Sequence, residues 1–229
     1  MSQKTSKLPE RPGYAFFHYH QSAMQMGGDY YAAIRMANGR LALVIADPSP
    51  KGAETVIRMR QLVTELNRRL VLETDPAAAM RNLNDWHCHK YSSKDSFVMV
   101  AIAVLDPDMH ELALVSAGHV MPIIRHFDGR VEEVDNQAVG MPLGLTGALY
   151  EQVAYSIGSG DVFVFFTGGL NAAMDDQGEL YSMERLRRVT VNAGRGAIAV
   201  GEAIVADVKQ LIGTRHIFHD LTLLVLGRE

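Results

Sequence analysis

The sequence LALVIADPSPKG, residues 41–52, joins a hydrophobic run to a segment with helical periodicity. Residues 41–45 are apolar at every position, which is typical of a β-strand buried on both faces. Beyond residue 52, apolar residues recur at alternating three- and four-residue spacing and predict an amphipathic helix over residues 52–72: Val56, Met59, Val63, Leu66 and Leu70. This stretch therefore predicts a buried strand that passes through a short turn with two prolines into a long helix.

Three further runs have the same uninterrupted apolar character, namely residues 97–105, 162–166 and 221–226. Each is rich in β-branched or aromatic residues and is short enough for a buried strand. The dipeptides Asn38-Gly39 and Asp128-Gly129 each lie between two strand-like segments, which is a strong short-range signal for a β-hairpin. Because a hairpin joins antiparallel strands, we expect antiparallel sheets.

Two more segments have the pattern of helices. Asp75 is a suitable N-cap and Pro76 suits the first helical position, so the sequence predicts a helix starting there. A third helix is predicted over residues 197–212, with Ile204, Val208 and Leu211 facing inward. Strands that are buried on both faces need a covering layer, and amphipathic helices supply one. The predicted fold is therefore α+β, a sandwich of antiparallel β-sheets flanked by helices.

Charge and composition exclude several classes of partner. The 229 residues carry 22 Lys and Arg against 26 Asp and Glu, a net charge of −4, so the chain lacks the basic field that nucleic acid or anionic lipid would need. The longest apolar run is too short to span a membrane as a helix. The single cysteine, Cys88, fits a reducing compartment. We therefore expect a cytoplasmic protein with neither a nucleic-acid nor a membrane partner.

Residues 1–12 are polar and contain two prolines but no periodicity, which suggests a tether or a domain junction. After them the sequence contains no linker rich in Ser, Gly or Pro and no internal repeat. A hydrophobic content of 48% is sufficient for a sizeable core. We therefore predict one domain over residues 13–229.

Seven different short motifs lie along the chain in this order: Gly27-Gly28-Asp29-Tyr30-Tyr31-Ala32, Ile45-Ala46-Asp47-Pro48-Ser49-Pro50-Lys51-Gly52, Ser116-Ala117-Gly118-His119, Gly140-Met141-Pro142-Leu143-Gly144, Gly160-Asp161, Thr167-Gly168-Gly169-Leu170-Asn171-Ala172 and His219-Asp220-Leu221-Thr222. Together they resemble the SpoIIE/RsbU branch of the metal-dependent, type 2C protein serine/threonine phosphatases. The resemblance covers nearly the whole chain. It implies an αββα sandwich, in agreement with the pattern of strands and helices.

The resemblance also implies a chemistry, the hydrolysis of phosphoserine or phosphothreonine with two Mn²⁺ or Mg²⁺ ions. Two divalent ions clamp the phosphoryl oxygens and activate a water molecule, and they need several carboxylates around them. The ligand acids of the family fall on Asp29, Asp47, Gly168 and His219. The backbone carbonyl of Pro48 falls on a further ligand position. Only two of the four acids are therefore present.

The remaining motif positions lower the expected affinity for metal ions further. Ala32 and Ala172 stand where the family motifs have two further acids. His219 suits Mg²⁺ poorly because imidazole prefers softer metals. Asp220, the next residue, points to the opposite face if the segment is a strand, so it reaches the site only if the strand end shifts. We expect Mn²⁺ or Mg²⁺, if any, to bind weakly or as a single ion.

Three functions follow from this resemblance. The first is a catalytically impaired phosphatase domain, a pseudophosphatase, which acts as a regulatory or partner-binding module in bacterial signalling. Its partner would be a phosphoprotein or a regulatory protein, such as one resembling an anti-sigma-factor antagonist. The alternative is an active Mn²⁺- or Mg²⁺-dependent protein serine/threonine phosphatase with a reduced ligand set. A third is a structural module joined to a sensor or forkhead-associated domain through residues 1–12.

Three residues are expected near the site. His119 belongs to a matched segment and is predicted to hydrogen-bond a turn rather than to bind metal. Ser49 and Lys51 follow Asp47 at the start of a helix, where backbone N–H groups could attract a phosphate. Simple helix capping explains the same two residues equally well, and the sequence leaves both interpretations open.

The other histidines do not suggest a second metal site. His87 and His89 are two residues apart on a predicted helix and point to different sides, so they cannot chelate one ion together. A partly buried His87 and a structural cysteine explain this segment better. His18 and His20 share one face of a predicted strand but have no third ligand, and an exposed strand face is the simpler interpretation.

Overall fold

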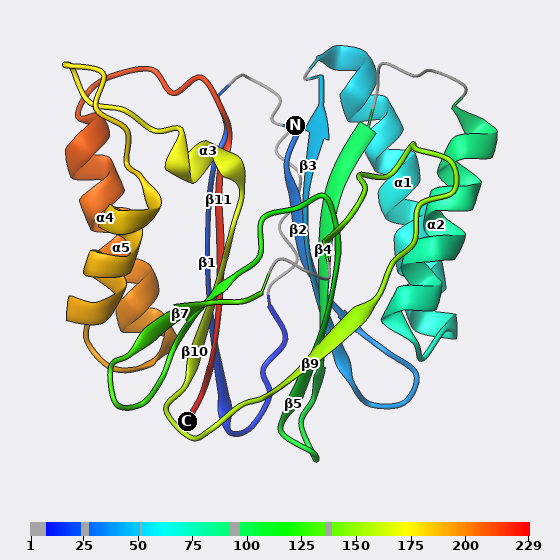
Figure 1. Ribbon diagram of the computed structural model, residues 1–229, viewed down its shortest axis with the longest axis horizontal. Coiled ribbons are helices and arrows are strands. Elements are labelled where there is room, and N and C mark those ends of the chain that lie inside the picture. Colours follow the sequence, from blue (N-terminus) through cyan, green and yellow to red (C-terminus); the bar gives the residue numbers. More distant parts are fainter. Residues whose placement is uncertain (1–7, 24–27, 51, 92–96, 136–138) are drawn as a thin grey trace. The chain divides into compact units, whose positions relative to one another are not determined.

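The computed structural model describes residues 8–23, 28–50, 52–91, 97–135 and 139–229. The chain divides into two compact units, which are described separately. The described residues of the first unit lie within Gly28–Met121 and Asp135–Ile157. The second unit contains Leu8–Gly27, Pro122–Val134 and Gly158–Glu229. Each unit consists of one β-sheet and its own helices (Figure 1).

The first unit contains a six-stranded sheet with the order β2-β3-β4-β5-β8, in which β9 also pairs with β5. Its strands are β2 (Tyr30–Arg35), β3 (Leu41–Ser49), β4 (Phe97–Asp106), β5 (Glu111–Ala117), β8 (Val139–Gly140) and β9 (Gln152–Ser156). The predicted Asn38-Gly39 hairpin joins β2 to β3, which pair antiparallel. The pair formed by β5 and β8 is parallel, so this sheet is mixed and not purely antiparallel as predicted.

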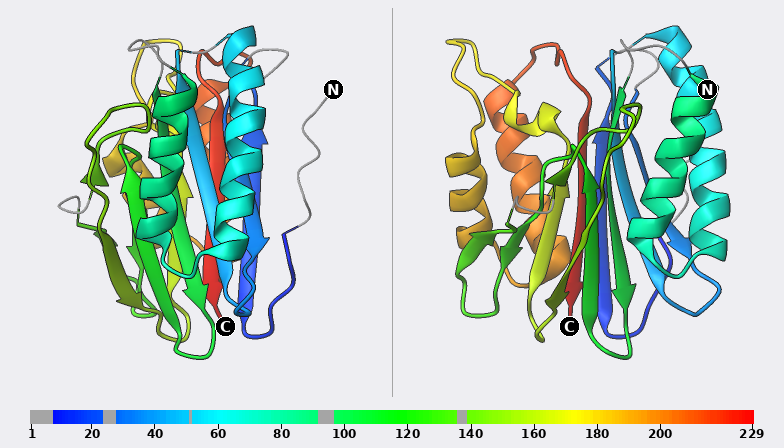
Figure 2. Two further views of the ribbon diagram at one scale, coloured as in Figure 1. Left: turned by 90° about the vertical axis from the view of Figure 1, so that its right-hand side faces the viewer. Right: turned by 45° about the vertical axis from the view of Figure 1, so that its right-hand side comes forward.

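Helices α1 (Ala53–Leu72) and α2 (Pro76–Lys90) lie side by side on one face of this sheet (Figure 2). The carboxylate of Asp75 accepts a hydrogen bond from the Ala77 N–H at 2.8 Å, so the predicted N-cap is confirmed. In α1 the fully buried stripe includes Leu62, whereas Val63 is only half-buried. Apolar residues of both helices and of the sheet form one core cluster, in which burial of each Val, Leu, Ile or Met side chain contributes roughly 1.5–3 kcal/mol.

The second unit contains a five-stranded sheet with the order β1-β11-β10-β6-β7, and all of its strand pairs are antiparallel. Its strands are β1 (Tyr14–Gln21), β6 (Ile123–Arg125), β7 (Val131–Glu133), β10 (Val162–Phe166) and β11 (Leu221–Arg228). The two central strands, β10 and β11, are the apolar runs predicted from the sequence. The predicted Asp128-Gly129 hairpin joins β6 to β7.

Three helices belong to the second unit: α3 (Gly168–Asn171), α4 (Met183–Asn192) and α5 (Gly196–Ile212). Helix α5 packs against β1, β10 and β11. Its residues Ile204 and Val208 are buried as predicted, whereas Leu211 is only half-buried and Ile212 takes the inward position. An ion pair between Arg185 and Asp207, with a nitrogen–oxygen distance of 2.7 Å, joins α4 to α5.

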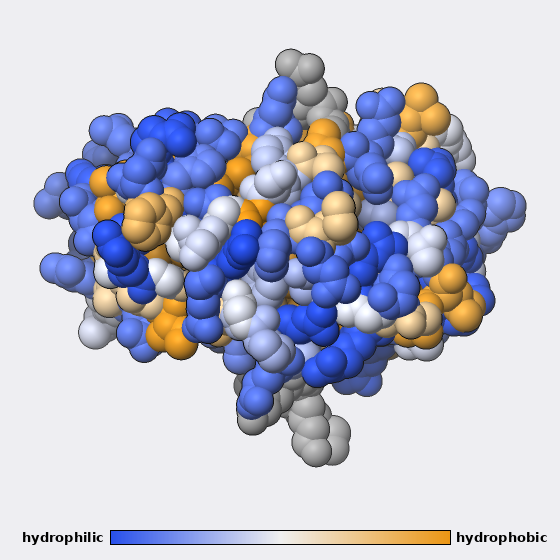
Figure 3. All heavy atoms as spheres, turned by 90° about the horizontal axis from the view of Figure 1, so that it is seen from below, coloured by the Kyte–Doolittle hydropathy of each residue, from blue (hydrophilic) through white to orange (hydrophobic). Residues whose placement is uncertain are grey.

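On the face drawn in Figure 3, hydrophobic residues form small separate groups among hydrophilic ones. No helix in the described part of the chain has the length and apolarity that crossing a bilayer requires.

Candidate functional site

The two retained acids lie at one end of the first unit's sheet. Tyr30 is opposite Ala46 in the antiparallel ladder of β2 and β3, so the next pair in the same register is Asp29 and Asp47. Both side chains are buried, with 3% and 8% of their surface exposed. Ala46 belongs to the core cluster beneath the helices. Because side chains alternate along a strand, Asp47 projects from the opposite face.

His119 belongs to a tight turn at the end of β5. The Ser116 hydroxyl donates a hydrogen bond to the His119 carbonyl at 2.8 Å, and the His119 N–H donates one back to the Ser116 oxygen at 3.1 Å. Nδ1 of His119 lies 2.9 Å from the Val120 carbonyl oxygen. Burial lowers the pKa of His119, and the negative charge of Asp29 partly offsets that effect. His119 therefore shapes this turn in the vicinity of Asp29.

Close packing of Gly118 against Pro142 also fixes the conformation of this turn. Gly118 has a φ of +70°, and a Cβ added there would lie 2.5 Å from the Pro142 ring. Only glycine fits both the left-handed conformation and the contact. The Gly118 N–H also donates to the Gly140 carbonyl at 2.7 Å. Two of the matched segments are therefore packed directly against each other.

Asn84 on α2 holds the second of these segments. Its Oδ1 accepts a hydrogen bond from the Gly144 N–H at 2.9 Å, and its Nδ2 donates to the Leu145 carbonyl at 2.9 Å. The side chain is 2% exposed. Asn84 could not be predicted from the sequence, because a single amide on a helix carries no periodic signal. The segment from Gly140 to Gly144 is thus anchored by a buried side chain.

The structure places the other predicted positions of this unit in different surroundings. Ala32 is buried in the core cluster beneath α1 and α2, so an acid at this position would meet apolar side chains. Pro48 lies in β3 opposite Val98, and Ser49 is the last residue of that strand. The N-cap of α1 is Gly52, and no side chain caps it, so the capping interpretation of Ser49 is wrong. Lys51 lies outside the described residues.

The second unit brings together the two positions where the expected acids are missing. Gly168 begins α3, and His219 lies just before β11. Between them Gly169 makes a very close contact, because a Cβ added there would lie 2.0 Å from the Asp220 carbonyl oxygen and 3.0 Å from His219 Cβ. A Cβ added at Gly168 would meet nothing within 4 Å. Gly168 is therefore replaceable, whereas Gly169 is required by packing.

Asp220 is buried and already used. Its exposed surface is only 1%, and its Oδ1 accepts a hydrogen bond from the Ala23 N–H at 2.8 Å. Its carbonyl oxygen lies 3.4 Å from the Thr167 hydroxyl, which also accepts a hydrogen bond from the Thr222 N–H. Moving Asp220 to replace an acid at position 219 would break these bonds. Ala172, the other replaced position, lines a pocket of the same unit.

The matched pair Gly160-Asp161 has a structural role. Oδ1 of Asp161 accepts from the Phe127 N–H at 3.0 Å, and Oδ2 accepts from the Gly158 N–H at 2.9 Å. Gly160 has a φ of +84°, and a Cβ added there would lie 2.5 Å from the Phe127 ring. This carboxylate therefore closes the turn before β10.

The histidines outside the matched segments form no metal centre. His87 is 2% exposed and more deeply buried than predicted, whereas His89 is exposed. His18 is exposed, and Nδ1 of His20 lies 3.0 Å from the Thr222 hydroxyl. In the described residues, neither unit gathers three or more His, Cys, Asp or Glu side chains into a group that could hold a metal ion.

The residues present do not fit a two-metal centre of the implied kind. Two hard divalent ions require several carboxylates to offset their mutual repulsion. Asp29 and Asp47 provide two, while the second unit provides a glycine and a histidine at the corresponding positions. Asp220 is held by a backbone hydrogen bond.

Comparison with known proteins gives a consistent result. A family model described as "Stage II sporulation protein E (SpoIIE)" matches residues 37–229. No curated protein matches the chain in sequence. A structure of the RsbU and RsbW domains of a Mycobacterium tuberculosis protein is 23% identical, with a TM-score of 0.81 over 97% of this chain and 62% of that one.

Two further structures share the fold. The phosphatase domain of Bacillus subtilis SpoIIE, with a fragment of its regulatory domain, is 15% identical, with a TM-score of 0.80 over 97% of this chain and 64% of that one. RsbX in complex with magnesium is also 15% identical, with a TM-score of 0.73 over 97% and 99%. The chain spans less than two thirds of the length of the first two structures. The predicted type 2C phosphatase fold is confirmed.

Proposed function

The chain belongs to the SpoIIE family of type 2C protein phosphatases, and on this premise we propose that it is a catalytically impaired phosphatase domain. In this proposal it acts in the bacterial cytoplasm as a regulatory module that binds a protein partner. The chemistry that the family implies needs carboxylates on two metal ions. In this proposal the chain keeps the phosphatase scaffold but lacks part of the set of carboxylates.

One observation carries the proposal. Gly168 and His219, the two positions without the expected acids, are neighbours across Gly169 in the second unit. The carboxylate next to His219 in the sequence, Asp220, is buried and accepts a hydrogen bond from the Ala23 N–H. The second unit therefore lacks two carboxylates that the family motifs have at these positions. A second divalent ion would then face uncompensated repulsion.

The first unit supports binding of one ion at most. Asp29 and Asp47 are adjacent in the strand register, and the carbonyl of Pro48 follows directly. Mg²⁺ typically binds through one or two carboxylates and keeps several waters. We propose that Asp29, Asp47 and the Pro48 carbonyl hold a single Mn²⁺ or Mg²⁺ weakly. RsbX, a structural relative, binds magnesium.

The proposed partner is a phosphoprotein or another regulatory protein. In the Mycobacterium tuberculosis relative, RsbU and RsbW domains occur in the same protein. A phosphatase domain that retains its scaffold but not its metals can still recognise a substrate-like protein. We therefore propose a partner resembling an anti-sigma-factor antagonist.

A phosphatase assay tests the impairment. We expect turnover of p-nitrophenyl phosphate and of a phosphoserine peptide to stay at background in both Mn²⁺ and Mg²⁺. Metal-dependent turnover that Asp47→Asn abolishes would instead support the alternative, an active phosphatase with a reduced ligand set. Asp85→Asn, at an exposed position of α2, is the matched control for loss of one carboxylate.

A binding assay tests the partner. An anti-sigma-factor antagonist from the same genome, prepared in phosphorylated and unphosphorylated forms, is titrated against the chain by calorimetry. We expect one form to bind without hydrolysis of the phosphoserine. Absence of binding by both forms would contradict this choice of partner but leave the result of the phosphatase assay unaffected.

A further inference from the structure

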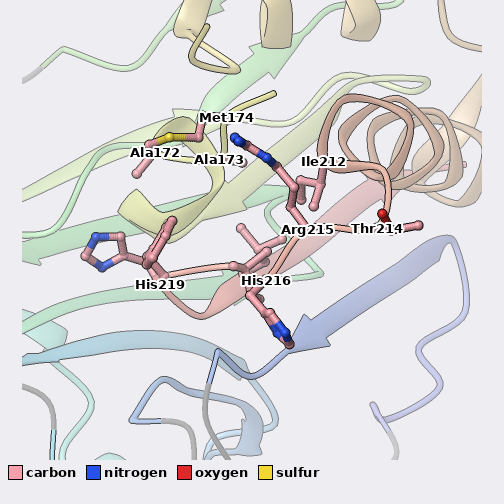
Figure 4. Close-up of a pocket in the computed structure, with 12 residues that line it drawn as sticks. Ala172, Ala173, Met174, Ile212, Thr214, Arg215, His216 and His219 are labelled. Carbon is pink, nitrogen blue, oxygen red and sulfur yellow. The ribbon is translucent and has the colours of Figure 1, made fainter. Parts of the chain in front are cut away.

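A pocket of about 510 Å³ lies within the second unit (Figure 4). Its walls come from the segment that begins at α3 and from the segment that joins α5 to β11. Much of the lining is apolar and includes Met174, Ile212, Ile217 and Leu221. A pocket of this size with mostly apolar walls has the dimensions of a site for a small organic molecule.

The main charged group of the pocket is Arg215. In Figure 4 its guanidinium group extends across the pocket toward Met174. It donates a hydrogen bond to the Asp175 carbonyl, which holds the side chain in place. Its Nε also lies 2.6 Å from Oδ1 of Asp176. The arginine is thus oriented from one side by the backbone.

Another anion can readily displace the Asp176 carboxylate from its ion pair with Arg215. The Asp176 side chain is 88% exposed and the Arg215 side chain 40% exposed. Ion pairs at such exposure contribute little, because water and salt compete with them. A ligand anion that is partly shielded inside the pocket would form a stronger pair with the same guanidinium.

The rest of the lining favours an anion over a cation. No Asp or Glu is among the residues that line the pocket. Its remaining polar residues include His216 and His219, whose rings extend in different directions in Figure 4. They therefore do not converge on one metal ion, and Arg215 remains the group that fixes the orientation of a ligand.

We propose that this pocket binds a small amphiphilic anion, with its apolar body against Met174 and Ile217 and its acidic head group on Arg215. The shared chemistry is a carboxylate or sulfonate attached to an aromatic or aliphatic body. The guanidinium fork can donate two parallel hydrogen bonds to two oxygens of either head group. The proposal involves no metal and no reaction step, although the lining includes Ala172 and His219 of the matched segments.

The test uses two fluorescent probes that differ by one charged group. 8-Anilinonaphthalene-1-sulfonate carries an acidic head group, and N-phenyl-1-naphthylamine has the same apolar body without it. We expect the sulfonate probe to bind the folded chain with 1:1 stoichiometry and more tightly than the neutral probe. Equal affinity for both probes would overturn the role of Arg215.

Two variants of opposite effect sharpen the test. Arg215→Gln should weaken binding of the sulfonate probe by about tenfold but leave the neutral probe unchanged, because it removes one charge-assisted contact. Asp176→Asn should strengthen sulfonate binding by about threefold, because it removes the competing exposed carboxylate. Arg187→Gln, which breaks an exposed ion pair with Glu133 on another part of the unit, is the control and should change neither.

A third variant locates the site. Ala172→Trp fills the pocket and should abolish binding of both probes, while the far-ultraviolet circular dichroism and the melting temperature verify that the variant is folded. Retained binding in a folded Ala172→Trp chain would place the probes elsewhere and overturn the proposal. An unchanged sulfonate affinity in both Arg215→Gln and Asp176→Asn would overturn it as well, without any need for the Trp variant.

Discussion

Oδ1 of Asp220 accepts a hydrogen bond from the backbone N–H of Ala23 at 2.8 Å, so the carboxylate next to His219 holds the end of the segment that follows β1. In the sequence, Asp220 looks like a spare acid beside the position where one is missing. In the structure it is a buried structural group. The missing charge at position 219 is therefore not supplied by its neighbour.

Replacing Asp220 tests this structural role. We expect Asp220→Ala to lower the free energy of unfolding by about 2 kcal/mol, because it removes a buried carboxylate and leaves the partly buried Ala23 N–H without its acceptor. Asp220→Asn keeps an oxygen acceptor and should cost less than half as much. Urea denaturation followed by circular dichroism measures both values. Equal stability of the alanine variant and the parent chain would contradict the structural role.

A second prediction concerns the anchor of the segment from Gly140 to Gly144. Asn84→Ala removes the hydrogen bonds to the backbone groups of Gly144 and Leu145, together with a weak one from the Cys88 thiol. Because Asn84 is only 2% exposed, the substitution should destabilise the chain by about 2 kcal/mol. Amide hydrogen exchange at Gly144 should become faster by more than the global change explains. Asn82→Ala is the matched control, because Asn82 is an exposed residue on the same helix that bonds only to Glu73. Its effect should stay within about 0.5 kcal/mol.

The fold could be predicted from the sequence because its main elements carry periodic signals. Helix α1, the N-cap at Asp75 and both Gly-containing hairpins follow from local spacing and turn chemistry. Helix α4 was not predicted, since its sequence is mostly polar and only Leu186 and Thr190 in it are buried. The parallel pair of β5 and β8 was also missed, because a two-residue strand has no pattern of its own.

The site was harder to predict because motif matching treats residues by their place in the chain. Motif matching treated Ala32 as a position where an acid is missing, but this side chain packs in the apolar core beneath α1 and α2. It could not detect that Asn84 and Asp161 hold matched segments in place, since their partners are backbone groups far along the sequence. These contacts follow from tertiary packing, which one sequence does not display.

A third prediction concerns pH. Burial, assisted by the positive charge of Arg58, lowers the pKa of His87 from 6.5 to about 4. Between these values the unfolded chain binds the proton and the folded chain does not, so the free energy of unfolding should fall as pH decreases from 6.5 toward 4. Below pH 4 this contribution should level off. His87→Gln should remove a pH-dependent component on the order of 2 kcal/mol, measured by urea titrations at several pH values. The same slope in parent and variant would contradict this assignment.

The last prediction restores the missing acids. Gly168→Asp is compatible with the backbone, because a Cβ at this position would meet nothing within 4 Å, and His219→Asp places a second carboxylate nearby across Gly169. We expect the double variant to bind Mn²⁺ at least tenfold more tightly than the parent chain by calorimetry, since each added carboxylate offsets part of the metal charge. His219→Asn is the control for loss of the imidazole without gain of charge and should show no increase. Gly169→Asp should instead destabilise the fold, because its Cβ would lie 2.0 Å from the Asp220 carbonyl oxygen. If the folded double variant gained no affinity for Mn²⁺, positions 168 and 219 would not be metal-ligand positions, and the proposed impairment would need another cause.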